Sequence, residues 1–259
     1  MRIFWFFFLW ATTLCGMQYQ KPAEASEGAW MAVQEYLLPF GHRVRGELDE
    51  IFRGARVTAN KDTLRAAGFA LTPDQGLHVF VASHPRLKGF LVKVILDKDT
   101  PNTDGKGMDW EHWIARINGE RIIRQGINDL GYKKYFKVPR QWIYPLSEGP
   151  EAVEREGYTP KAFILVVEDM KLEPKKVNTE LYREISTSRL KAIFRMATNF
   201  GLSDCCNKHN VPWCKDGKMA FVDTETFGRW PVDYHRMVEF LSPKGRMYWK
   251  KLRAQGGSK

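Results

Sequence analysis

The sequence predicts an α+β fold, with a small antiparallel sheet in the N-terminal half and helices after it. Two short runs, 77–83 and 89–96, have the β-branched and aromatic composition of strands. In 178–200, by contrast, the apolar residues recur at helical spacing. The chain has 259 residues, of which 44% are hydrophobic and 27% charged. This composition is typical of a globular protein with a real core, and it excludes a disordered chain, collagen or a coiled coil.

The first sixteen residues, MRIFWFFFLWATTLCG, have the pattern of a secretory signal. Arg2 precedes an apolar run from Ile3 to Ala11, and small or polar residues follow. The run is shorter than the roughly 20 apolar residues that cross a bilayer. We therefore expect a cleaved signal peptide at 1–16, a mature chain without a stable membrane span, and an exported protein that is periplasmic or secreted. An uncleaved anchor and a buried N-terminal helix are the alternatives.

Residues 20–65 are expected to form a helical extension. The apolar residues of 29–53 recur at helical spacing, and Pro39 and Gly41 interrupt the pattern. The pattern therefore predicts helices that precede the sheet.

Residues 66–170 are expected to hold the sheet and one inserted helix. The two apolar runs named above form an antiparallel hairpin through the turn at 84–88. Periodic apolar residues indicate a helix over 110–130, which Gly119 is expected to break. Two further strands are predicted, at 141–146 and 161–168.

Residues 171–253 are expected to be mainly helical. The span 178–200 reads as one long helix that Asn178 or Thr179 caps. A polar loop follows it, and then a short strand at 219–223 and a last helix near 232–241.

The chain is basic, with 40 lysines and arginines against 30 acidic residues and a formal net charge of +10. This charge favours anionic partners, namely nucleic acid, lipid headgroups or nucleotide phosphates. The segment 244–253, KGRMYWKKLR, interleaves Tyr248 and Trp249 with basic residues. It suits a single nucleic-acid strand, an anionic membrane, or a solvated helix face whose aromatic rings pack inward. Nucleic acid is the least favoured partner, because an exported protein rarely meets it.

Three cysteines follow the signal, Cys205, Cys206 and Cys214, and an odd number within ten residues is no disulfide framework. With His209 they supply four side chains of the kind that binds zinc. Adjacent cysteines rarely bind one ion, and the segment has no C-x2-C pair. Buried or reactive thiols are therefore favoured over zinc.

The segment 201–228 contains the best candidates for catalytic and metal-binding residues. Asp204 and Asn210 lie in a polar loop, and a turn then leads into a short strand that ends on Asp223. The return of the chain brings two carboxylates and an amide together. Oxygen ligands of this kind suit Mg²⁺ that is shared with phosphates.

The order of a loop aspartate, an asparagine and a strand ending in a metal-binding aspartate resembles the protein-kinase-like superfamily. Other residues between about 66 and 241 match in order. Lys93 lies in mid-strand, like the lysine that pairs with nucleotide phosphates, and the next predicted helix carries Glu111 and Glu120. A later strand runs into Glu168-Asp169-Met170, where a hinge that contacts adenine is expected.

The resemblance implies a two-lobed protein-kinase-like fold. The N-lobe is a small antiparallel sheet within 66–170, the helical C-lobe within 171–253 is reduced, and the helical extension at 20–65 precedes both. It also implies ATP and Mg²⁺ as cofactors.

For nucleotide binding, the resemblance implies that Lys93 orients the phosphates and that a glutamate of the next helix holds the lysine. Glu120 is preferred for that role, with Glu111 as the alternative. Glu168 and Met170 are expected at the adenine.

For catalysis, the resemblance implies that Asp204 is the base that receives the proton of the acceptor. Asp223 and Asn210 are expected to hold Mg²⁺, and Asn207 competes with Asn210 because Asp204 and Asn210 are one residue further apart than usual. The phosphate acceptor is unidentified, and a protein is one candidate.

Four features depart from the family pattern. No G-x-G-x-x-G precedes Lys93, Ser203 stands where an arginine is usual, Thr224-Glu225 replaces Phe-Gly, and few residues follow Asp223. The resemblance is therefore compatible with an ATP-dependent phosphotransferase or with a degenerate pseudokinase that binds a nucleotide with Mg²⁺.

The segments at 142–145 (WIYP) and 223–225 (DTE) are similar to uncharacterised exported proteins of chlamydia-like bacteria. The alternative function is a non-enzymatic, basic secreted protein that binds anionic surfaces or host components.

Overall fold

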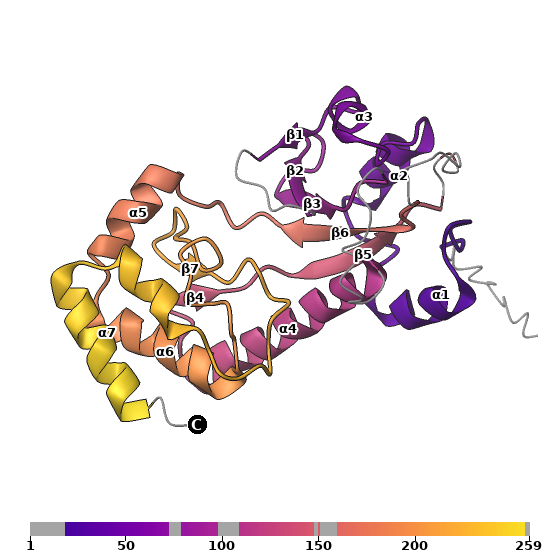
Figure 1. Cartoon of the computed structure of the whole chain (residues 1–259). Helices are drawn as coiled ribbons and strands as arrows, with labels where there is room; N and C mark the ends of the chain where they lie inside the picture. The colour runs from indigo at the N-terminus through magenta and orange to yellow at the C-terminus, as the bar shows by residue number, and fades with distance from the viewer. Residues whose placement is uncertain (1–18, 73–78, 98–108, 148–149, 151–159, 257–259) are drawn as a thin grey trace, which may run out of the picture.

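The computed structural model describes residues 19–72, 79–97, 109–147, 150 and 160–256 (Figure 1). The predicted signal at 1–16 lies outside these residues. The predicted α+β class is confirmed, because a five-stranded antiparallel sheet is combined with helices before and after it. Within the described part of the chain, each helix is too short or too polar to cross a membrane.

The sheet has the strand order β1-β2-β3-β6-β5, and every neighbouring pair is antiparallel. The expected hairpin is confirmed as β2 and β3, and β6 lies between β3 and β5. The strands are β1 (Ala70–Leu71), β2 (Phe80–Ser83), β3 (Phe90–Val94), β5 (Gln141–Pro145) and β6 (Phe163–Glu168).

The two faces of the sheet are buried by different helices, because successive strand residues point to opposite faces. Ile164 and Val166 of β6 pack with residues of α2 (Arg45–Arg53) and α3 (Lys61–Ala66). Leu165, between them in sequence, packs with residues of α1 (Glu27–Val33) and α4 (Asp109–Asp129). The expected helical extension thus covers the sheet. As predicted, its helices are interrupted after the short 3₁₀ turn η1 (Gln34–Tyr36).

A second apolar core lies among the C-terminal helices. Helix α4 joins the two regions, because one end packs on β5 and β6 and the other on α6 (Figure 1). A short parallel pair, β4 (Phe136–Lys137) and β7 (Met219–Ala220), lies beside these helices. The helices are α5 (Lys175–Arg183), α6 (Thr187–Phe200), the 3₁₀ helix η2 (Tyr234–Phe240) and α7 (Pro243–Gly256).

The prediction of one long helix over 178–200 was wrong. The chain leaves the helical conformation after Arg183 and begins again at Thr187, because the side chain of Ser186 caps the new helix by accepting from Arg189 N. Asn178 does not act as a cap. It is buried within α5, where its side chain accepts from Trp213 N and donates to the Lys208 carbonyl.

The prediction that Gly119 breaks its helix was also wrong, since α4 is continuous from Asp109 to Asp129. A side chain at Gly119 would meet the backbone of Thr224, so the glycine permits a close approach of two segments. The expected last helix near 232–241 is the 3₁₀ helix η2, and α7 follows it.

Replacing Ser186 with alanine is expected to lower the free energy of unfolding by about 1 kcal/mol, because the first turn of α6 loses its cap. Urea unfolding followed by circular dichroism measures the change. Thr187→Ala is the matched control, since this exposed neighbour has no capping bond, and it should leave the urea midpoint almost unchanged. Equal midpoints for Ser186→Ala and the wild type would contradict the capping role.

Candidate functional site

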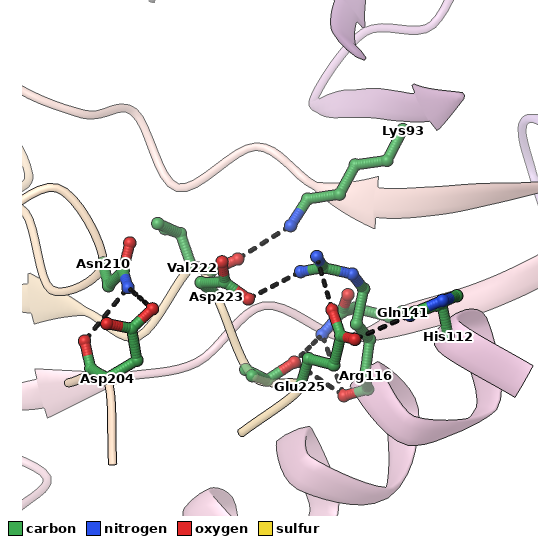
Figure 2. Close-up of polar contacts among 10 residues, drawn as sticks. Lys93, His112, Arg116, Gln141, Asp204, Asn210, Val222, Asp223 and Glu225 are labelled. Atoms are coloured by element: carbon green, nitrogen blue, oxygen red, sulfur yellow. Dashed lines mark hydrogen bonds and ion pairs between the residues drawn. The ribbon is translucent and has the colours of Figure 1, made fainter. Parts of the chain in front are cut away.

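Lys93 enters the site from the sheet. Its position on β3 is directly opposite Leu165, which packs on the α4 side of the sheet, so the lysine points to that side too. The side chain is only 8% exposed, and Nζ donates a hydrogen bond of 2.8 Å to the carbonyl of Val222 (Figure 2). A strand of the sheet is thereby linked to the segment that follows β7.

The pKa of Lys93 is lowered from 10.5 to about 7, and burial is the largest cause. The positive charge of Arg116 contributes to this lowering, while the carboxylates of Asp223 and Glu225 act in the opposite direction. A strongly shifted amine among specific charged neighbours is a feature of functional sites.

Arg116, on α4, connects two carboxylates of the segment after β7. Its Nη1 lies 2.7 Å from Asp223 Oδ1 and its Nη2 lies 2.8 Å from Glu225 Oε2. His112, one turn earlier on α4, lies 2.7 Å from the other oxygen of Glu225. Figure 2 shows Arg116 between the two acids, with Lys93 reaching toward them from the strand.

The charges around Asp223 keep it ionised. Burial by itself would raise its pKa, but Arg116 and Lys93 lower the pKa below the ordinary value. The pKa of Glu225 is also lowered. Burial acts against its charged form, but His112 and Arg116 favour that form and outweigh the effect of burial. Both carboxylates are therefore negative at neutral pH.

The segment 223–225 is fixed to α4 by its middle residue. The hydroxyl of Thr224 donates to the Arg116 carbonyl at 2.6 Å and accepts from Gln141 Nε2 at 3.0 Å. Thr224 is buried, and Gly119 leaves the room that its carbonyl requires. The flanking acids, Asp223 and Glu225, are positioned as a consequence.

Asp204 and Asn210 form the other side of the site. The amide Nδ2 of Asn210 donates to the Asp204 carboxylate at 2.9 Å and to its carbonyl at 3.0 Å. The Asn210 carbonyl accepts from Val222 N at 3.0 Å, so the loop is tied to the residue whose carbonyl receives Lys93. Figure 2 shows the side-chain oxygen of Asn210 directed away from Asp204.

Asp204 has a raised pKa. Burial is the largest cause, the nearby charge of Asp223 adds to it, and the ion pair with Arg236 opposes it. Such a shift brings a carboxylate closer to the pKa range of a general base.

The structure brings four of the predicted site residues together: Lys93, Asp204, Asn210 and Asp223. Asn207, the alternative to Asn210, lies in a tight turn, where its side-chain oxygen accepts from His209 N at 3.0 Å. Of the two amides, Asn210 has the oxygen that is better placed for a metal ion.

The two candidate glutamates of α4 lie elsewhere. Glu120 is buried and pairs with Arg124, and Glu111 is exposed near the start of the helix. Burial raises the pKa of Glu120, and Arg124 opposes that shift. The residues of α4 that contact the site are Arg116 and His112, and neither was predicted from the sequence. For Arg116 the available signal was its place between Trp113 and Ile117, on a helical face that is otherwise apolar.

Glu168 and Met170 lie where β6 leads toward α5. The Glu168 carboxylate accepts from Arg140 Nε at 2.7 Å and from Arg140 N at 3.0 Å, and the Met170 carbonyl accepts from Lys137 Nζ at 3.1 Å. Arg140 opposes the effect of burial and lowers the pKa of Glu168. These groups already have protein partners, so an adenine would have to use other backbone groups of this strand end.

The site offers two protein ligands for a magnesium ion, Asp223 and Asn210. In the described residues, no three or more His, Cys, Asp and Glu side chains gather in the manner of a metal site. Asp223 is ionised, and Asn210 has an oxygen directed away from Asp204. These two protein ligands leave the remaining positions to phosphate oxygens and water, as is usual for Mg²⁺ with nucleotides.

The cysteines and the basic segment have mainly structural positions. Cys205, Cys206 and Cys214 are free and buried. The basic segment forms α7, where Trp249 is 0% exposed and donates to the Tyr234 carbonyl at 2.9 Å. That ring is therefore a core residue. The basic residues remain candidates for anionic partners.

No model of a known protein family matches the chain, and no significant match to a curated protein was found.

Proposed function

We propose that the protein is a divergent member of the protein-kinase-like superfamily that binds a nucleotide together with Mg²⁺. The observation that carries the proposal is the convergence of Lys93, Asp204, Asn210 and Asp223, which come from a strand, a loop and the segment that follows β7. The four come from positions up to 130 residues apart, and titratable groups gathered from distant segments are candidates for a functional site.

The arrangement of the elements supports the same proposal. A small antiparallel sheet carries Lys93, helix α4 packs against it, and a mainly helical region carries Asp204 and Asn210. These would be the two lobes of a kinase-like fold, the second one reduced. The nucleotide would lie between β3 and the segment at 222–223, where its phosphates would replace the Val222 carbonyl as the partner of Lys93.

In this proposal Lys93 orients the phosphates, and Asp223 and Asn210 hold the magnesium ion. The ion, when bound, supplies neutralisation of the phosphate charge. Asp204 would accept the proton of an acceptor hydroxyl, and its raised pKa suits that role. Phosphoryl transfer needs positioning and charge neutralisation above all, and the residues named here could provide both.

Two features bear on whether transfer occurs. Arg236 occupies one oxygen of Asp204, and Arg116 occupies one oxygen of Asp223. An acceptor or a metal ion that used these same oxygens would have to displace an arginine. A pseudokinase that binds a nucleotide and an active phosphotransferase are both consistent with the arrangement. Export to the periplasm or medium stays a prediction from residues 1–16.

Mg²⁺ and ATP together are expected to raise the unfolding temperature of the wild type, because a ligand at 100 times its Kd adds about 2.7 kcal/mol of stability. Asp223→Asn should lose this shift, since it removes the charged metal ligand. Differential scanning fluorimetry with ATP, with and without Mg²⁺, measures both.

Asp129→Asn is the matched control, because this exposed acid at the end of α4 accepts a hydrogen bond from Gln125 and lies outside the site. Its shift with Mg²⁺ and ATP should equal that of the wild type. An equal shift in Asp223→Asn, or no shift in the wild type, would refute nucleotide binding at this site.

A further inference from the structure

Arg116 places a positive charge on the acid proposed to bind magnesium. The residue is 7% exposed, and each of its terminal nitrogens has a carboxylate partner, Asp223 on one and Glu225 on the other. A guanidinium is always charged, so this cation is present at every ordinary pH. A metal ion at Asp223 would be repelled by this cation, and at Oδ1 it would have to displace it.

The second partner of Arg116 is held independently of the first. Glu225 also pairs with His112 on the preceding turn of α4, and the adjacent Thr224 is fixed by its hydrogen bonds to α4 and β5. Arg116 could therefore release Asp223 and still remain paired with Glu225. Its Nε is buried and has no hydrogen-bond partner among the described residues. That nitrogen therefore does not fix the orientation of the guanidinium.

When Lys93 is protonated, the charges of this cluster balance, because Lys93 and Arg116 oppose Asp223 and Glu225. Whether or not Lys93 is protonated, a divalent cation alone would leave an excess of positive charge in the cluster. A cation that arrives with a polyanionic phosphate chain would restore the balance, since the phosphates can pair with Lys93. The site should accordingly discriminate between the free metal ion and the metal–nucleotide complex.

We propose that Arg116 is a built-in counter-ion of the metal site, which occupies Asp223 in the free protein and makes divalent-cation binding depend on the nucleotide. It is a positioning residue that acts through Asp223. The inference rests on the proposed function, because it takes Asp223 as the metal ligand. It adds to that function a control on when the ligand is available.

The test is the binding of Mn²⁺, a spectroscopic substitute for Mg²⁺, to the full chain without nucleotide, followed by the electron paramagnetic resonance of the free ion. The wild type should bind weakly, and Arg116→Gln should bind about tenfold more tightly through Asp223. Arg116→Lys keeps the charge and should remain weak. Adding Asp223→Asn to Arg116→Gln should abolish the gain.

Glu225→Gln supplies a test of opposite sign. Arg116 would then have Asp223 as its sole charged partner, so Mn²⁺ binding should become weaker than in the wild type. In the Arg116→Gln background the same change should have a much smaller effect, because no arginine remains to be redirected. An equal effect in both backgrounds would show that Glu225 acts only through its own charge, and would overturn the anchoring role.

The outcomes separate this inference from the proposed function. Mn²⁺ binding by a folded Arg116→Gln that is no tighter than the wild type overturns the counter-ion role, even when Asp223→Asn still removes the stabilisation by Mg²⁺ and ATP. If Asp223→Asn leaves that stabilisation unchanged, the proposed function itself fails. Should Arg116→Gln not fold, Arg116→Lys and Glu225→Gln decide the question, and a Glu225→Gln affinity equal to or above that of the wild type overturns the inference.

Discussion

Replacing Gly119 with alanine is expected to lower the free energy of unfolding by about 3 kcal/mol or more. A Cβ at this position would lie 1.7 Å from the carbonyl oxygen of Thr224, which is backbone and has no alternative rotamer. Either α4 or the segment 223–225 must move. Because Thr224 is tied to α4 and to Gln141, the displacement would also disturb the acids on either side of it.

Equilibrium urea unfolding followed by tryptophan fluorescence measures the effect of Gly119→Ala. Gly46→Ala is the matched control, since this glycine is also helical but has open space where the new Cβ would be. The control should be neutral or more stable by up to about 1 kcal/mol, because alanine favours helix over glycine. A Gly119→Ala protein with the wild-type urea midpoint would contradict the close approach of α4 and 223–225.

Replacing Lys93 with methionine is expected to stabilise the protein below pH 7 by roughly 4 kcal/mol, and to remove any binding of nucleotide phosphates through this residue. The pKa of Lys93 is about 7 in the folded protein and 10.5 ordinarily, so the folded state resists its protonation. Methionine has a similar length and no charge to bury, and it leaves Arg116 to pair with Asp223.

The pH dependence has a definite sign. Below pH 7 the wild-type lysine is charged in both states, and the folded state carries the full penalty of burial. Between pH 7 and 10.5 the unfolded state binds more protons than the folded state, so wild-type stability rises with pH. The advantage of Lys93→Met should therefore be largest below pH 7 and shrink as the pH approaches 10.

Chemical unfolding at pH 6, 8 and 9.5 tests this expectation. Lys88→Met is the matched control, because it removes an exposed lysine of the same hairpin and should keep the wild-type pH profile. A constant difference between Lys93→Met and the wild type over this range would show that Lys93 does not titrate near pH 7. If Lys93→Met is more stable but no longer gains unfolding temperature with Mg²⁺ and ATP, the buried charge of Lys93 lowers stability and is needed for binding.

Much of the site could be predicted from the sequence because its residues have marked local settings. Lys93 is a charge in the middle of an apolar strand, and Asp223 ends a short apolar run after a turn. Asp204 and Asn210 stand in a polar loop after an apolar helix. Each differs in polarity from its neighbours in the chain. The order of the four residues then indicated that they could form one site. The partner of the cluster on α4 could not be chosen in this way, because Glu111, Arg116 and Glu120 all lie on one helix, and only its rotation against the sheet decides which of them faces Asp223.

The sequence alone determined the α+β class and the antiparallel hairpin, since these depend on periodicity and on neighbours in the chain. The order of residues that resembles the kinase-like superfamily singled out four polar residues that lie near one another in the structure. Tertiary structure decided the division of the long helix at Ser186, the purpose of Gly119 and the presence of Arg116 in the site. The contacts behind the last two join distant positions: Arg116 and Asp223 are separated by 107 residues. A contact of that range depends on how α4 packs between the sheet and α6, and a local pattern does not contain that information.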